Sequence, residues 1–146
     1  VLLGAEYDED LSDLSPDGQW LAYTSDESGQ NEIYVRPYPN IEEGKVQVSA
    51  DGGDEPVWGP DGQELFYRNG NALMVLSFED DPNFLPGLPE ELFTWNAVGA
   101  AGGHYDVSPD GRFLVMKAGG GETTGPQIII IQNWFEELNR LAPPLE

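Results

Sequence analysis

The chain has 146 residues, of which 27 are Asp or Glu and only 6 are Lys or Arg, so its formal net charge is −21. A surface this acidic repels phosphate groups, which excludes nucleic acids as partners. The absence of cysteine excludes disulfides and thiolate metal sites. The longest apolar run, residues 128–131, is too short to span a membrane, and no basic segment followed by an apolar stretch opens the chain, so we expect neither a transmembrane segment nor a signal peptide.

Residues 8–50 contain the first of three similar segments. We expect strands at 11–15, 20–25, 32–37 and 45–49 because strand-forming residues there alternate with polar ones between turn residues. The turn before the second strand is Pro16-Asp17-Gly18. Pro presets φ near −65°, and Asp followed by Gly tolerates a tight reversal, so this turn predicts an antiparallel hairpin.

The same Pro-Asp-Gly turn returns at Asp61 and Asp110, 44 and 49 residues further along. A repeat of 40 to 50 residues built from short strands is typical of β-propeller blades. The second blade, 51–97, has predicted strands at 55–59, 64–68, 72–78 and 91–95, with an Asn69-Gly70 hairpin turn. The third, 103–133, has predicted strands at 104–108, 112–117 and 127–132.

Two further elements are predicted at the ends. Residues 1–7 form an apolar segment that could complete the three-stranded last blade as its outer strand. Residues 134–142 are predicted to form a short C-terminal helix, because their apolar positions share one helical face and two prolines follow. Large aromatic residues near the turns are expected to pack between blades: Trp20, Trp58 and Phe113.

The predicted fold is therefore all-β, with three four-stranded propeller blades in a single domain, 1–146. Three blades are too few to close a ring and would leave two apolar flanks open. Two copies related by a two-fold axis would make six blades, so we expect a homodimer.

Several segments resemble the Pro-Asp-Gly blades of TolB-type β-propellers: 15–29, 32–39 and 64–70. The ending, residues 133–138, is similar to the tail of the C-terminal propeller blades in bacterial Ser/Thr kinase-associated sensor proteins. The chain departs from the pattern at Gly59, where Ser is usual. The resemblance implies a bacterial protein whose propeller binds proteins or peptides, although the same fold carries many activities.

Acidic residues precede the first strands of two blades at equivalent places: Glu9 and Asp10, then Asp54 and Glu55. His104, the only histidine, takes the third equivalent place. We expect these five residues to surround one mouth of the propeller channel. A basic peptide could dock there, or a weak, irregular calcium site could form at Asp10 and Asp54. Simple solvation of exposed carboxylates is the alternative.

No other cofactor is expected, because the chain has too few histidines for zinc and no phosphate-binding loop. His104 is either a catalytic base or metal ligand, or a residue that lines the channel. The sequence favours a non-catalytic propeller module that self-assembles into a six-bladed ring and presents a protein- or peptide-binding face. The alternatives are a fragment or designed chain with no activity of its own, and a propeller lyase or hydrolase that uses acidic channel residues.

Overall fold

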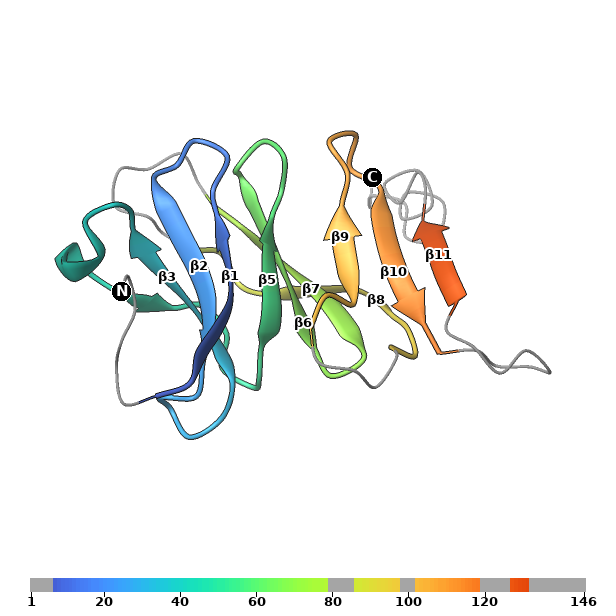
Figure 1. Ribbon diagram of the computed structural model, residues 1–146, viewed down its shortest axis with the longest axis horizontal. Helices are drawn as coiled ribbons and strands as arrows, with labels where there is room; N and C mark the ends of the chain where they lie inside the picture. The colour runs from blue at the N-terminus through green and yellow to red at the C-terminus, as the bar shows by residue number, and fades with distance from the viewer. Residues whose placement is uncertain (1–6, 79–85, 98–101, 119–126, 132–146) are drawn as a thin grey trace, which may run out of the picture.

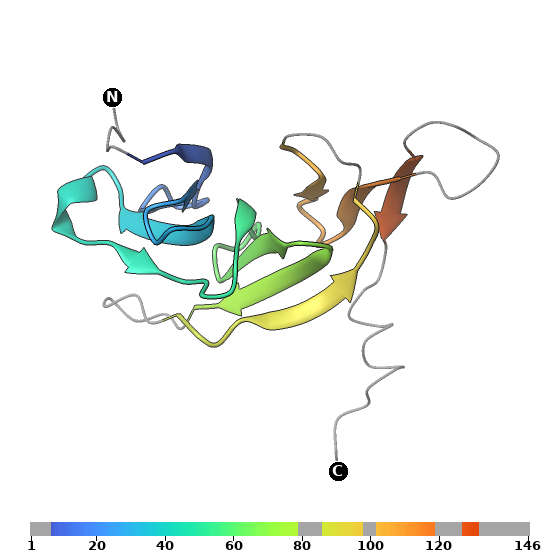
Figure 2. The ribbon, with the colours of Figure 1, turned by 90° about the horizontal axis from the view of Figure 1, so that it is seen from below.

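The computed structural model describes residues 7–78, 86–97, 102–118 and 127–131. These residues form three antiparallel sheets that fan out along an arc (Figures 1 and 2). Within the described part of the chain the only helical segment is the 3-10 turn η1 (Ile41–Glu43). The expected all-β class is confirmed, whereas the predicted outer strand 1–7, apart from Tyr7, and the predicted helix 134–142 lie outside the described residues.

In every sheet each strand pairs with the next one along the chain. Sheet 1 consists of β1 (Glu9–Leu14), β2 (Trp20–Ser25), β3 (Glu32–Pro37) and β4 (Val46–Gln47). Sheet 2 consists of β5 (Asp54–Trp58), β6 (Glu64–Asn69), β7 (Ala72–Ser77) and β8 (Glu90–Thr94). Sheet 3 consists of β9 (Tyr105–Val107), β10 (Phe113–Lys117) and β11 (Gln127–Ile131). The expected strands all occur, with small shifts at their ends.

The three Pro-Asp-Gly turns join the first and second strands of each sheet and lie at the same end of the molecule, the top of Figure 1. Each turn glycine has a positive φ, 71° at Gly18, 74° at Gly62 and 75° at Gly111, a conformation that a side chain disfavours. The Asn-Gly prediction was wrong in register. Asn69 pairs with Ala72, so the two central turn residues are Gly70 and Asn71.

The core lies between the sheets. One apolar cluster joins sheets 1 and 2 around Trp58, with Trp20 packed against it, and a second joins sheets 2 and 3 around Phe113. Phe66 and Phe113 meet edge to face across the second contact, with ring centroids 5.0 Å apart, a favoured aromatic geometry. The three aromatic residues predicted to pack between repeats therefore do so.

The face of sheet 1 that points away from sheet 2 is not a bare apolar surface, which corrects the expectation for that flank. Tyr23 and Tyr34 are buried there. The Arg36 guanidinium lies 5.6 Å from the Tyr23 ring centroid and donates to the Tyr23 hydroxyl over 2.7 Å. Lys45 lies 5.2 Å from the Tyr34 ring centroid and pairs with Glu27. Cation–π contacts thus cover this face with charge.

Candidate functional site

The first strands of the three sheets, β1, β5 and β9, run side by side across Figure 1 and line a shared hollow of about 450 Å³. Its walls carry Asp13 and Leu14 from β1, Trp58 from β5 and Asp106 from β9. Asp13 also links two sheets, because its Oδ2 accepts a hydrogen bond from the Trp58 backbone N–H over 2.8 Å. The hollow is therefore a joint product of all three repeats.

A bulge interrupts β1 and β5 at the same place in the repeat. The pairing register shifts between Asp10 and Asp13, and again between Asp54 and Val57. At each bulge one residue other than glycine takes a positive φ, 48° at Leu11 and 55° at Glu55. In both strands the preceding aspartate accepts a hydrogen bond from that residue's backbone N–H. A bulge re-aims the side chains next to it, which matters most for Glu55.

Glu55 forms a buried polar cluster with residues of both sheets 2 and 3. Its Oε2 accepts the backbone N–H of His104 over 2.9 Å, and its Oε1 contacts His104 Nδ1. Arg68, on β6, approaches the same Oε1 with Nε at 3.2 Å and Nη2 at 3.0 Å. The Tyr105 hydroxyl donates to the Glu55 carbonyl over 2.6 Å, and burial together with the charge of Glu55 raises the pKa of Tyr105 well above its ordinary value.

The structure thus brings two predicted site residues together but buries them. Glu55 is 5% exposed and His104 is 2% exposed, so neither belongs to an open acidic rim. His104 is a core residue that ties sheet 3 to sheet 2. Sequence reasoning missed Arg68, although the hairpin register that pairs Asp54 with Arg68 is the signal that could have found it.

The other three predicted site residues line another pocket of about 470 Å³. They stand near the starts of β1 and β5, and these strands begin at the end of the molecule opposite the Pro-Asp-Gly turns (Figure 1). Glu9 and Asp10 reach the pocket from β1, and Asp54 from β5. They lie inside strands, not in the loops before them as predicted. Asp54 is partly neutralised, since Arg68 Nη2 lies 3.5 Å away. Among the described residues, no three His, Asp or Glu side chains gather closely enough to hold a metal ion.

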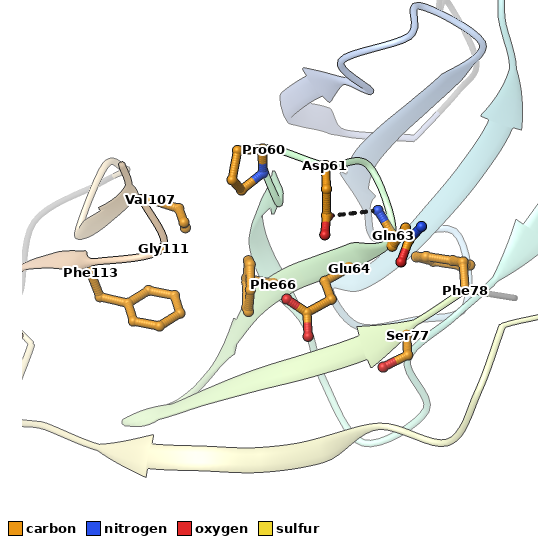
Figure 3. Close-up of a pocket in the computed structure, with 10 residues that line it drawn as sticks. All are labelled: Pro60, Asp61, Gln63, Glu64, Phe66, Ser77, Phe78, Val107, Gly111 and Phe113. Carbon is orange, nitrogen blue, oxygen red and sulfur yellow. Dashed lines mark hydrogen bonds between the residues drawn. The ribbon is translucent and has the colours of Figure 1, made fainter. Parts of the chain in front are cut away.

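A third cavity, a groove of about 340 Å³ between sheets 2 and 3, was not predicted from the sequence (Figure 3). Glu64 lies at its base beside the ring of Phe66, and Asp61 projects toward it from the Pro-Asp-Gly turn. Burial, and then the charge of Asp61, raise the pKa of Glu64 above its ordinary value. The signal in the sequence was Glu64 itself, a carboxylate where the first repeat carries Trp20.

Similarity to solved structures identifies the fold. No protein-family model and no curated protein matches the chain. Among solved structures, an oligogalacturonate lyase from Vibrio parahaemolyticus is 16% identical with a TM-score of 0.58, covering 79% of this chain and 31% of the lyase. TolB from Acinetobacter baumannii is 17% identical with a TM-score of 0.58, covering 84% of this chain and 29% of TolB.

A putative TolB from Agrobacterium tumefaciens is 24% identical over 64% of this chain and 36% of that one, with a TM-score of 0.49. The likeness to the lyase and to the Acinetobacter TolB, each with a TM-score of 0.58, shows that the chain has a TolB-like β-propeller fold. The chain spans about a third of the length of each of the three proteins. They give no support to the predicted link with Ser/Thr kinase sensor proteins. No helix in the described part of the chain is long and apolar enough to cross a membrane.

Proposed function

We propose that the chain is a non-catalytic set of three propeller blades that completes a six-bladed ring with a second copy and binds a protein or peptide at the face of that ring. The observation that carries this proposal is the shared hollow, which β1, β5 and β9 line together. In a closed ring such a hollow becomes a channel. A second copy would supply the missing walls and double the number of carboxylates from Glu9, Asp10 and Asp54 at one mouth.

The burial of Glu55 and His104 supports the non-catalytic part. A general base must come within hydrogen-bonding distance of its substrate, and both side chains are instead almost fully buried, at 5% and 2% exposure. The rival proposal is a lyase or hydrolase that uses the open carboxylates of the acidic pocket. Turnover of glycans or peptides that Asp10→Asn abolishes would favour this rival.

The acidic pocket lined by Glu9, Asp10 and Asp54 is the part of the proposed face that would bind a basic peptide. Weak binding of a calcium ion at Asp10 and Asp54 is the alternative. The carboxylates of the pocket share one cavity, and like charges held together raise the local potential for cations. Replacing Glu9, Asp10 and Asp54 by their amides should remove either ligand while the β-sheet circular dichroism stays unchanged.

Light scattering tests the assembly. At micromolar concentration we expect about twice the chain mass of 16.0 kDa. Leu114, on the face of sheet 3 that points away from sheet 2, is 40% exposed, so Leu114→Glu should return the dimer to a monomer. Leu88, 88% exposed outside the strands, is the matched control, and Leu88→Glu should leave the dimer intact. A parent chain that is monomeric and soluble at that concentration would refute the two-copy ring.

A further inference from the structure

The groove between sheets 2 and 3 has a carboxylate at its floor and aromatic side chains along its walls (Figure 3). Phe66 and Phe113 approach it from the two sheets, and Phe78 lies near its far end. The Glu64 carboxylate projects into the space between Phe66 and Ser77. We propose that this groove binds the guanidinium group of an arginine side chain that a peptide presents to it.

The groove carries negative charge that no described cation balances. Glu64 forms no ion pair with any described residue, and Asp61 adds a second negative charge nearby. Partial burial and the charge of Asp61 raise the pKa of Glu64, and no described cation pairs with its ionised form. A bound cation would remove this penalty, so the groove is complementary to positive charge.

The walls favour arginine over lysine. A guanidinium group is planar, stacks on aromatic rings and pairs with a carboxylate through two parallel N–H groups. An ammonium group is a compact, strongly hydrated charge that loses more solvation in such a space. Gln63 and Ser77, which also line the groove, add oxygen atoms that can accept the remaining guanidinium N–H groups.

The equivalent contact between sheets 1 and 2 shows what is particular about the groove. Trp20 stands 44 residues before Glu64, and Trp58 stands 49 residues before Val107. Both tryptophans join the apolar cluster there, and Trp58 is 5% exposed. The repeat thus places two large apolar side chains in one contact and a carboxylate and a valine in the other. Because only sheets 2 and 3 are involved, the groove does not depend on the proposed ring.

The probe is the peptide acetyl-Gly-Arg-Gly-amide, with a citrulline peptide of nearly the same shape but no charge as its partner. We expect the arginine peptide to shift the backbone amide resonances of Gln63, Ser77 and Gly111 in 0.15 M NaCl, and the citrulline peptide to have no such effect. Glu64→Gln, which keeps the side-chain size, should weaken binding at least tenfold. Glu42→Gln removes a charge from an exposed site in η1 and should leave binding unchanged.

Three results would overturn the proposal: equal binding of the two peptides, equal effects of Glu64→Gln and Glu42→Gln, or shifts that map to Glu9 and Asp10 in place of the groove. Circular dichroism of each variant verifies that it has folded. A monomer in light scattering would refute the two-copy ring but leave the groove experiment valid, so the two proposals fail separately.

Discussion

The contacts of sheet 2 with its two neighbours each bury a carboxylate, but they balance its charge in different ways. Next to sheet 1, Glu32 is 1% exposed and is held by uncharged donors. The side-chain amide of Gln30 and the backbone N–H of Gly52 donate to Oε1 over 2.5 Å and 3.0 Å, and Ser49 donates to Oε2. Glu32 thereby orders the connection that leads from sheet 1 to sheet 2.

Next to sheet 3, Glu55 is held by the cationic Arg68 and by His104. The partners of Glu55 belong to different sheets, so this carboxylate fastens one sheet to another.

Glu32 also acts on its surroundings through its charge. Burial and then the charge of Glu32 raise the pKa of Tyr67 to about 12. The comparison shows that one repeat pattern can join its units through a neutral network or through an ionic one.

Glutamine substitutions at the two buried carboxylates should separate the two kinds of network. Glu55→Gln leaves Arg68 without its closest anionic partner, and breaking a buried ion pair is costly. We expect it to lower the free energy of unfolding by about 3 kcal/mol. Glu32→Gln keeps an acceptor oxygen and leaves no cation unpaired, so we expect a loss of about 1 kcal/mol. Urea denaturation measures both, and equal losses would contradict the distinction.

The two contacts also differ in how they fill space. On the strand that follows the turn, sheet 1 presents Trp20 and then Ala22 to sheet 2, whereas sheet 2 presents Glu64 and then Phe66 to sheet 3. Ala22 is fully buried, with 0% exposure. The large side chain is therefore near the turn in one contact and two residues further along in the other, which leaves room beside Glu64 for the groove.

Ala22→Phe would give the contact between sheets 1 and 2 the large side chain that Phe66 provides in the contact between sheets 2 and 3. Because the site is already filled, we expect overpacking to cost about 1–3 kcal/mol. Ala50, exposed in the connection between sheets 1 and 2, provides the control for the same substitution, and Ala50→Phe should change stability by less than about 0.5 kcal/mol. Thermal or urea unfolding compares the two variants. A neutral Ala22→Phe would mean that the two contacts are interchangeable.

The sequence could predict the strands and the three Pro-Asp-Gly turns because short-range patterns and turn chemistry determine them. It could also align Asp54 with Asp10. It could not predict that Glu55 points into the core, because glutamate is not a residue that signals a positive φ, and the bulge depends on pairing with β6. The groove depends on two residues from different repeats, Glu64 and Val107, and no local pattern relates them.

The smallest effect concerns the pH dependence of stability at Glu64. Burial raises the folded-state pKa of this carboxyl above its ordinary value of 4.5, so the folded protein binds more protons than the unfolded chain just above pH 4.5. Stability then falls as pH rises through the folded-state pKa. Glu64→Gln has no such proton, and at pH 7 it should be more stable than the parent by less than about 1 kcal/mol, since the site is only half-buried.

As pH falls through 4.5 and below, Glu64 becomes protonated in both states, and the difference between parent and variant should shrink toward zero. Because the net charge of the chain is −21, removing any carboxylate relieves some repulsion. Glu42→Gln, at an exposed position, measures that general effect on stability. The effect specific to Glu64 is the stability that Glu64→Gln gains beyond the gain of Glu42→Gln. Urea titrations of the three proteins between pH 4 and pH 7 give this excess. If Glu64→Gln and Glu42→Gln follow the same curve, Glu64 is an ordinary solvated carboxylate and the contrast between the two contacts is steric only.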